Sequence, residues 1–287
     1  MGVEKTHFWK EQGLYGVELM TASLQSHDYS PHVHDGFVLA VTEEGSSWFN
    51  SRGVREFAAT DRVLIFNPDE PHSGNMKDCT HWNYRAFYIN WEAVCHLCED
   101  IEIQPKDFPY FLTNVIDDPC LSNTLRLAHS FIQNSLNIYD SKVVFIEALD
   151  RLFSYGVKKK NLDIFALGGD SQKKISYISE FIKENCDKNL SITCLAKECG
   201  MPAYSLMRNF KKRRGLTVHA YLMQCRLHKA RALLRDGVSI AEAGYQSGFY
   251  DQSKLTKYFK SSYAITPKKY QQSVCPFPTA GSLQSKQ

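Results

Sequence analysis

The feature that most constrains this chain is a repeat in its second half. The segment 206–211 (LMRNFK) returns 49 residues later as 255–260 (LTKYFK), and in both copies a tyrosine follows the phenylalanine at a spacing of 11 residues. Each copy also contains a short predicted helix, a glycine (Gly200 or Gly248) and a second predicted helix. This order is the helix-turn-helix pattern, in which the turn sets the second helix at a steep angle and lets it enter a DNA major groove.

Local signals divide the rest of the second half into further helices. One amphipathic helix is predicted by an apolar stripe through Ile175, Ile178, Phe181 and Ile182. Ser191 and Thr217 are candidate N-caps. We expect helices at about 191–199, 202–213, 217–235, 240–247 and 251–262. The long helix at 217–235 would join the two helix-turn-helix units, so that they reach two adjacent major grooves. The alternative is an all-helical bundle or repeat array.

The charge of the chain favours the DNA-binding interpretation. Residues 1–170 hold 14 Lys and Arg against 24 Asp and Glu, whereas residues 171–287 hold 20 against 7. The overall formal charge of +3 therefore conceals an acidic half and a basic half. This asymmetry predicts that only the second half meets a polyanion, the alternative being chance drift in composition.

The first half has the pattern of a β-rich domain. Short apolar runs at 37–41, 47–50, 62–66 and 85–90 predict strands, with turn signals between them. Such strands indicate a sandwich or barrel. Helical periodicity then appears at 121–132 and at 143–153, which predicts two antiparallel helices that cap the barrel or form a dimer interface. The lysines at 158–160 and the stretch 168–171 (GGDS) are typical of a linker.

The doubled motif resembles the AraC/XylS family of bacterial transcription regulators over roughly residues 173–273. The residues that carry the resemblance are Leu195-Ala196, Gly200, Leu206, Arg208, Phe210, Gly215, Tyr221, Arg226-Leu227, Ala230-Arg231 and Leu233-Leu234 in the first copy, and Ile240-Ala241-Glu242, Gly248-Phe249, Asp251-Gln252-Ser253, Phe259-Lys260, Thr266-Pro267 and Tyr270 in the second. Three positions depart from the family pattern: Pro202 replaces a capping Ser, Gly244 replaces an Ala, and Ala264 replaces a Gly.

The resemblance implies an α+β fold. We expect a cupin-like β-barrel with flanking helices at residues 1–160, which would bind an effector and dimerise. A linker at 161–172, an all-α domain with two helix-turn-helix motifs joined by a long helix at 173–273, and a flexible tail at 274–287 would follow.

The resemblance also implies the function. We expect a cytoplasmic, sequence-specific transcription regulator, usually an activator, that is controlled by a small-molecule effector and has no enzymatic activity, resident metal or cofactor. Its expected partners are double-stranded DNA and a second copy of the chain, with RNA polymerase as a further candidate. The nine scattered cysteines, the absence of a secretion signal and the absence of an apolar run of about 18 residues agree with reduced thiols and no membrane segment.

The polar faces of the two predicted recognition helices supply the candidate DNA contacts. Leu206, Phe210, Leu255 and Phe259 occupy the apolar stripes and should be core. Arg208 is suited to guanine, Gln252 to adenine and Thr256 to a thymine methyl group. Basic side chains such as Lys211 are suited to phosphates. The full candidate set is Tyr204, Met207, Arg208, Lys211, Lys212, Gln252, Lys254, Thr256 and Lys257. Each of these side chains is otherwise an ordinary solvated surface residue, and Arg226 and Arg231 are expected to be structural or to contact phosphates.

The histidines of the first half mark the candidate effector site. The segments 31–37 (PHVHDGF) and 67–72 (NPDEPH) resemble the two cupin motifs. In metal cupins a Glu follows the His-x-His pair, but Val38 lies near that position here. We expect a metal-free pocket in which imidazoles and aromatic side chains hold a small molecule, lined by His32, His34, Phe37, Trp48, His72, Trp82 and Tyr88. A three-histidine metal site and plain structural histidines remain as alternatives.

Two other function classes remain open. One is a cupin-type metal enzyme with a helical appendage, and the other is a constitutive DNA-binding protein whose barrel only dimerises. The lone Cys95-x-x-Cys98 pair has no second pair at zinc spacing, which argues against a zinc or redox site there.

Overall fold

The computed structural model describes residues 5–76, 79–134, 138–157 and 170–275. Two compact units are present: residues 1–28 with 33–166, and residues 29–32 with 167–287. Residues 29–32 form a strand of the same sheet as residues 72–75, so we call residues 1–166 the first unit and residues 167–287 the second unit. The predicted linker at 161–172 falls largely on residues 158–169, which lie outside the described residues, and the first helix after it begins at Asp170. Most of the predicted tail, residues 276–287, is also outside them.

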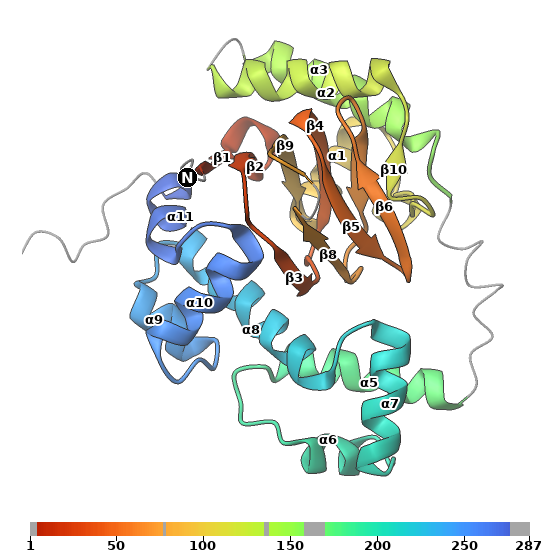
Figure 1. Cartoon of the computed structure of the whole chain (residues 1–287), viewed down its shortest axis with the longest axis vertical. Helices are drawn as coiled ribbons and strands as arrows, with labels where there is room; N and C mark the ends of the chain where they lie inside the picture. Colours follow the sequence, from red (N-terminus) through yellow and green to blue (C-terminus); the bar gives the residue numbers. More distant parts are fainter. Residues whose placement is uncertain (1–4, 77–78, 135–137, 158–169, 276–287) are drawn as a thin grey trace, which may run out of the picture. The chain divides into compact units, whose positions relative to one another are not determined.

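Two antiparallel sheets form the framework of the first unit (Figure 1). The six-stranded sheet has the order β1 (Lys5–Glu11), β2 (Val17–Leu24), β9 (Trp82–Ile89), β4 (Phe37–Gly45), β7 (Val63–Phe66) and β10 (Val115–Ile116). The four-stranded sheet has the order β3 (Tyr29–His32), β8 (His72–Asn75), β5 (Ser47–Ser51) and β6 (Val54–Ala58). Phe66 of the first sheet contacts Phe49 and His72 of the second, at ring-centroid distances of 5.5 and 3.9 Å, so the sheets pack face to face.

The six-stranded sheet is covered on its other face by helices. These are α1 (Trp91–Asp100), α2 (Pro119–Gln133) and α3 (Ile138–Phe153), with short 3-10 segments at Gln12–Leu14 and Pro105–Asp107. Leu39, Val41, Phe87 and the helices share one apolar core. Because side chains alternate along a strand, Val38, Ala40 and Thr42 of β4 point to the opposite face, toward the four-stranded sheet. This alternation decides which predicted site residues can meet.

The two predicted helices of the first unit are present, with one difference. In α2 the predicted stripe of Leu121, Leu125, Ala128 and Ile132 is buried. In α3 the buried residues include Phe145, Ala148 and Leu149, while Val143, which we expected in the stripe, is 56% exposed. The period was recognised correctly, but the sequence alone did not show which face of a largely apolar helix packs against the sheet.

The second unit is helical throughout. It contains α5 (Asp170–Glu184), α6 (Ile192–Glu198), α7 (Ala203–Arg214), α8 (Val218–Arg235), α9 (Ile240–Gln246), α10 (Gln252–Tyr263) and α11 (Pro267–Val274). Both predicted caps are confirmed. The Ser191 and Thr217 hydroxyls each accept a hydrogen bond at 3.1 Å, from the amides of Cys194 and Ala220. The fold therefore follows the local signals of the sequence closely in this half.

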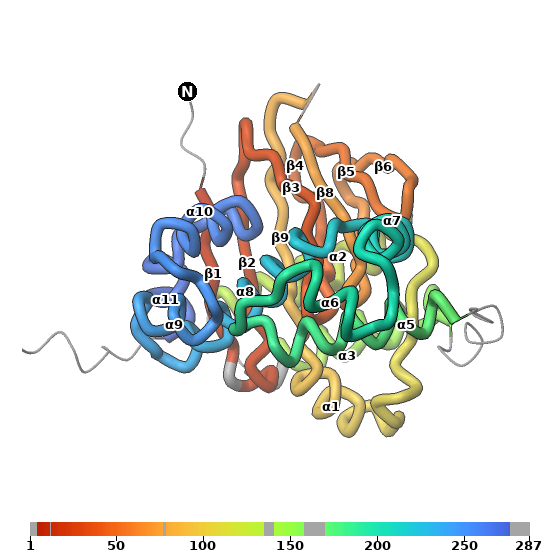
Figure 2. Tube along the Cα trace, turned by 90° about the horizontal axis from the view of Figure 1, so that it is seen from below, coloured from red at the N-terminus to blue at the C-terminus, as the bar shows by residue number. Residues whose placement is uncertain are grey.

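The helix α8 links two similar groups of helices. The group of α5, α6 and α7 lies toward one end of α8, and the group of α9, α10 and α11 toward the other (Figures 1 and 2). In each group a glycine with positive φ ends the short helix: Gly200 at 60° and Gly248 at 84°. The predicted double helix-turn-helix architecture is confirmed. Among the described residues no helix is long and apolar enough to cross a membrane.

Candidate nucleic-acid interface and buried histidine cluster

The two recognition helices, α7 and α10, bury the side chains that the repeat pattern assigned to the core. Leu206 and Phe210 of α7, and Leu255 and Phe259 of α10, are fully buried. The Phe210 ring contacts Tyr221 and the Phe259 ring contacts Tyr270, so each Phe–Tyr pair of the repeat forms the same contact in both copies. This packing turns the remaining faces of both helices outward.

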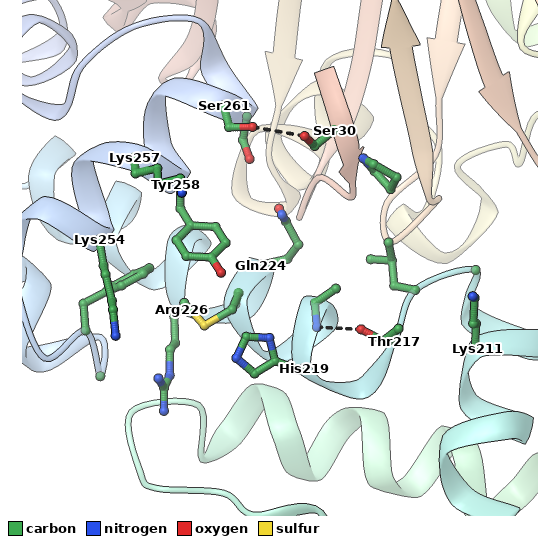
Figure 3. Close-up of a pocket in the computed structure, with 18 of the residues that line it drawn as sticks. Ser30, Lys211, Thr217, His219, Gln224, Arg226, Lys254, Lys257, Tyr258 and Ser261 are labelled. Carbon is green, nitrogen blue, oxygen red and sulfur yellow. Dashed lines mark hydrogen bonds between the residues drawn. The ribbon is translucent and has the colours of Figure 1, made fainter. Parts of the chain in front are cut away.

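The predicted DNA contacts lie on those outward faces. Tyr204 is 71% exposed and Met207 is 46% exposed. Thr256 is the exception, because it is half-buried on α10. Figure 3 shows Lys211, Lys254 and Lys257 among the side chains that line a hollow of this unit. The exposed polar candidates are Arg208, Lys211, Lys212, Gln252, Lys254 and Lys257.

Electrostatics on α7 separate structural cations from candidate contacts. The Arg214 side chain donates to the Ser179 hydroxyl at 2.9 Å, and Arg213 donates to the Gln172 side-chain oxygen at 2.7 Å. Within the described part of the chain, no carboxylate pairs with Arg208, Lys211 or Lys212. These three cations are therefore not neutralised by the protein and remain available to an anionic partner.

Two arginines of α8 are structural. This is one of the two roles that we expected for them, the other being contact with phosphates. Arg226 is 7% exposed and donates to the carbonyl oxygens of Cys186 and Lys188, at 2.7 and 2.9 Å. Arg231 donates to the Tyr270 hydroxyl and lies over the ring of Tyr263. Their charges therefore hold loops and helices together inside the unit.

Sequence reasoning missed two exposed tyrosines beside the second recognition helix. Tyr245 on α9 is 78% exposed, and Tyr250, which directly precedes the N-cap Asp251, is 75% exposed. An aromatic residue outside the apolar stripe of its helix was the available signal. Tyr250 precedes its recognition helix, whereas Tyr204 lies within the first turn of α7, so the two tyrosines are not equivalent positions of the repeat.

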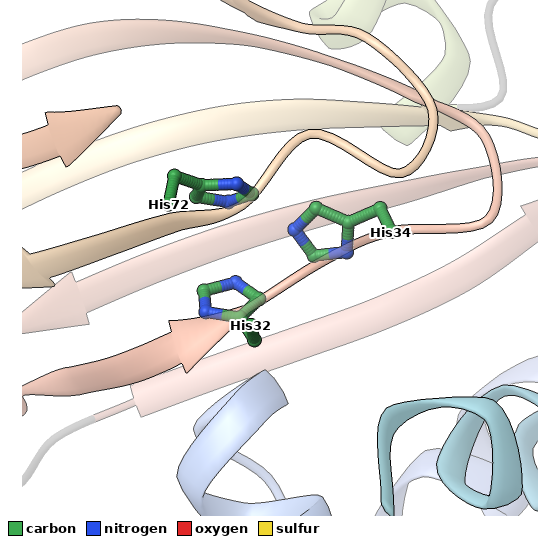
Figure 4. Close-up of side chains that lie close together, drawn as sticks. All are labelled: His32, His34 and His72. Carbon is green, nitrogen blue, oxygen red and sulfur yellow. The ribbon is translucent and has the colours of Figure 1, made fainter. Parts of the chain in front are cut away.

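In the first unit, the structure brings the three predicted histidines together (Figure 4). His32 ends β3, His34 follows it in the next loop, and His72 begins β8. They are 4, 4 and 8% exposed, and one ring nitrogen from each lies within 4.8 Å of the others. Among the described residues, no other group of three His, Cys, Asp or Glu side chains is so placed.

Backbone hydrogen bonds orient two of the rings. Nδ1 of His32 lies 2.8 Å from the Ser30 carbonyl oxygen, and Nδ1 of His72 lies 2.9 Å from the Glu70 carbonyl oxygen. A carbonyl only accepts, so Nδ1 carries a proton in both rings. Burial lowers the pKa of His72 to about 4, against the effect of its hydrogen bond to Glu70, so this ring is neutral at pH 7.

The turn between β7 and β8 is held by hydrogen bonds to the buried carboxylate of Glu70, whose backbone carbonyl contacts His72. Burial alone would raise the pKa of Glu70, but the hydrogen bonds that the carboxylate receives lower it overall, so it stays ionised. Sequence reasoning did not identify Glu70 as a positioning residue, because its partners come from distant segments. The donors to its carboxylate are the side chains of Ser51, Arg52, Asn67 and Asn114.

The predicted aromatic residues do not all lie near the histidines. Tyr88 and His34 form an edge-to-face contact, with ring centroids 5.4 Å apart. Trp82 is buried, stacks on Tyr84 and donates to the Thr42 hydroxyl.

The other two aromatics lie elsewhere. Phe37 belongs to the apolar core under the helices and contacts Phe108 and Phe111. Trp48 is half-buried and packs against Phe57 and Arg55. The structure thus does not bring Phe37 or Trp48 to the histidine cluster.

The cysteine pair of α1 shows no sign of reactivity. All nine cysteines are free thiols. Cys98 is buried, and burial raises the pKa of its thiol to about 11, with a smaller contribution from Cys95. A thiol with such a pKa is protonated and unreactive at neutral pH.

Comparisons with known proteins agree with both halves of this description. Residues 14–149 match the AraC-like ligand binding domain, and residues 195–273 match a helix-turn-helix domain. Fold and site together define a DNA-binding transcription regulator with an N-terminal ligand-binding domain. The chain belongs to the AraC/XylS family of transcription regulators.

Individual relatives are distant but extend over most of the chain. The HTH-type transcriptional regulator YbfI of Bacillus subtilis is 26% identical over 78% of this chain and 80% of its own length. The transcriptional activator RhaS of Mannheimia succiniciproducens is 24% identical over 84% of this chain and 88% of its own length. The structure of ToxT from Vibrio cholerae with a bound unsaturated fatty acid covers 96% of this chain and 99% of that one, with a TM-score of 0.54 and 15% identity.

Proposed function

We propose that this regulator activates transcription from sites where both helix-turn-helix units bind the same duplex, in two adjacent major grooves. The observation that carries the proposal is the repeated geometry of α7 and α10, each of which buries its Leu–Phe stripe and exposes its polar face. The name of the RhaS relative supports activation. Activation would involve contact with RNA polymerase.

We assign base and phosphate contacts by side-chain chemistry. Arg208 would bind guanine through two hydrogen bonds and Gln252 would bind adenine in the same way. The half-buried Thr256 would present its methyl group to a thymine. Tyr204 and Met207 would pack against the DNA at the first helix. The lysines 211, 212, 254 and 257 would neutralise phosphates and so provide affinity without sequence information.

Selection from a random DNA library tests this assignment. Wild type, Arg208→Ala and Lys212→Ala are compared at one fixed salt concentration. We expect wild type to recover a single motif, Arg208→Ala to lose preference at one base pair at a cost of about 1–3 kcal/mol, and Lys212→Ala to bind all sequences more weakly with an unchanged motif. Recovery of no motif by wild type, with and without cell extract as a source of effector, would refute sequence-specific binding.

A small-molecule effector would bind between the two sheets of the first unit. The buried imidazoles of His34 and His72 and the ring of Tyr88, which contacts His34, support this proposal, and Trp82 would add further aromatic surface. The effector would act by shifting the population of DNA-binding conformations, since a ligand shifts an equilibrium only through its different affinities for the two states. Thermal-shift screening of metabolites tests this, because a ligand at 100 times its Kd adds about 2.7 kcal/mol of stability.

Dimerisation and location complete the proposal. Leu127 of α2 and Val143 of α3 are 49 and 56% exposed, which leaves apolar surface on the helices of the first unit for a second copy of the chain. We infer a homodimer and no catalytic activity. We also infer a cytoplasmic location, which the nine free thiols support. If the protein sediments as a monomer at micromolar concentration in analytical ultracentrifugation, the homodimer is excluded.

A further inference from the structure

We propose that His32, His34 and His72 form a binding site for one divalent first-row transition-metal ion, and that occupancy of this site regulates DNA binding. The second part rests on the function proposed above, whereas the first part does not. The sequence favoured a metal-free pocket because Val38 stands where a metal cupin has a carboxylate. The arrangement of the three rings is what changes this interpretation.

The spacing of the rings fits a shared ion after a small adjustment. One nitrogen from each ring lies within 4.8 Å of the other two. Metal–nitrogen bonds of about 2.0–2.1 Å require ligand nitrogens about 3 Å apart in tetrahedral or octahedral geometry. The nitrogens would therefore move closer by up to about 2 Å when they share one ion. The His34 and His72 rings, whose centroids are 4.9 Å apart, already lie at the distance of neighbouring ligands.

The rings of His32 and His72 are oriented as the rings of metal-binding histidines usually are. A ligating histidine almost always donates its second ring N–H to a carboxylate or a backbone carbonyl, which sets the tautomer. His32 and His72 do this through Nδ1, to the carbonyls of Ser30 and Glu70. This arrangement leaves Nε2 of each ring as the nitrogen that would bind the ion.

The supports behind the ligands are themselves rigid. His72 stacks on Phe66, with ring centroids 3.9 Å apart and planes within 12°. The carbonyl that accepts from His72 belongs to Glu70. The Glu70 carboxylate in turn accepts hydrogen bonds from four side chains, which fix the position of this residue. A site held by rigid second contacts needs little ordering when it binds its ion.

The donor set also selects the kind of ion. Three neutral imidazoles suit Zn²⁺, Co²⁺, Ni²⁺ or Cu²⁺, whereas Mg²⁺ and Ca²⁺ require oxygen ligands. With three protein ligands, at least one coordination position stays open for water or an effector atom. Because the cluster contributes no negative charge, the bound ion would keep its full double charge and attract an anionic group to that position.

Cobalt binding to the full-length protein tests the site directly. The protein is stripped with a chelator and titrated with Co²⁺, while visible absorption is recorded and bound metal is measured after dialysis. We expect one ion per chain, absorption typical of nitrogen coordination, displacement by Zn²⁺ and no competition from Mg²⁺. The variants His34→Ala and His72→Ala should weaken binding by at least about tenfold. His96→Ala removes a half-exposed histidine of α1 and should leave binding unchanged.

Folding is checked by circular dichroism for every variant, and His34→Gln replaces any alanine variant that fails to fold. Folded wild type that retains neither Co²⁺ nor Zn²⁺ would overturn the site. Metal that binds equally to wild type and to all folded histidine variants would overturn it as well, because the ion would then lie elsewhere.

DNA affinity of the loaded and stripped protein tests the regulatory part. We expect a change of at least about fivefold in Kd between the two states, and no change for His34→Ala. Equal affinities with metal bound would overturn regulation and leave a structural ion. Failure to bind any DNA in either state would instead refute the proposed function, and the cobalt result would stand independently of it.

Discussion

The turn glycines of the two helix-turn-helix units, Gly200 and Gly248, both have positive φ angles but different surroundings. Alanine substitutions at these positions therefore separate the energetic cost of backbone strain from the cost of overpacking. Gly200 has φ 60° and a Cβ added there meets no atom within 4 Å. Gly248 has φ 84°, and a Cβ there would lie 2.8 Å from the Asp187 carbonyl oxygen and 3.0 Å from Nε of Arg226. The first glycine is needed only for its φ angle, whereas the second is also needed because it lacks a side chain.

The expected losses follow from these surroundings. An L-residue in the left-handed region costs about 1–2 kcal/mol, of which the lower entropy of the unfolded alanine chain returns about 0.4–1 kcal/mol. Gly200→Ala should therefore cost about 1 kcal/mol. Gly248→Ala adds overpacking of about 1–3 kcal/mol and disturbs the Arg226 hydrogen bond to Cys186, which is 2.7 Å long. We expect a total of about 4 kcal/mol.

Urea unfolding of the full-length protein measures both losses. All four tryptophans (Trp9, Trp48, Trp82 and Trp91) belong to the first unit, so fluorescence reports that unit while far-UV circular dichroism reports all helices. Gly248→Ala should move the helical transition to lower urea and leave the fluorescence transition in place. Equal losses for the two variants would refute the reasoning, because the packing of Gly248 against the loop at Asp187 would then carry no energy.

Three further predictions follow from single sites. Gly244→Ala should raise the free energy of unfolding by about 1 kcal/mol in urea denaturation, because the new methyl group meets Leu255 only at an ordinary 3.6 Å; a loss of stability would contradict this. Ala264→Gly should add about 0.5 kcal/mol in the same assay, because Ala264 caps α10 at φ 53°, and no gain would show that this cap is unstrained. Burial, with a smaller effect of Arg85, lowers the pKa of His129 to about 3, so lowering the pH from 7 to 5 protonates this ring only in the unfolded chain and should cost about 2 kcal/mol. His129→Gln should remove that part of the acid sensitivity, and an unchanged pH profile would refute the assignment.

The helical unit could be predicted from its sequence almost to the residue, because its signals are local. Ser191 and Thr217 cap helices within three residues of themselves, and Gly200 and Gly248 end helices by their own backbone conformation. The alternation of buried and exposed side chains on α7 and α10 follows from helical period alone. The DNA-facing candidates were therefore found at exposed positions, apart from the half-buried Thr256.

The first unit could be predicted only in outline, because sheets are made by contacts between distant segments. β2 is buried on both faces for most of its length, so its sequence shows no alternation, and the edge strand β1 is only partly buried. The face on which Phe37 lies depends on the register of β4 against β9, which no local pattern reveals.

The residues that support the histidine cluster were hidden for the same reason. The Glu70 network joins segments up to 44 residues apart in the chain. The histidines themselves were found through the resemblance of their motifs. Their mutual distances and the tautomers of His32 and His72, on which the metal proposal depends, required the structure.

We propose above that one chain places its two recognition helices in successive major grooves. Methylation-protection footprinting of the full-length protein on its selected DNA site tests this most directly. We expect two protected major-groove segments about 10 base pairs apart on one face of the duplex. Arg208→Ala should reduce the protection of one of these segments, and Gln252→Ala should reduce the protection of the other. A single protected segment, or two segments that both weaken equally with either variant, would contradict the claim.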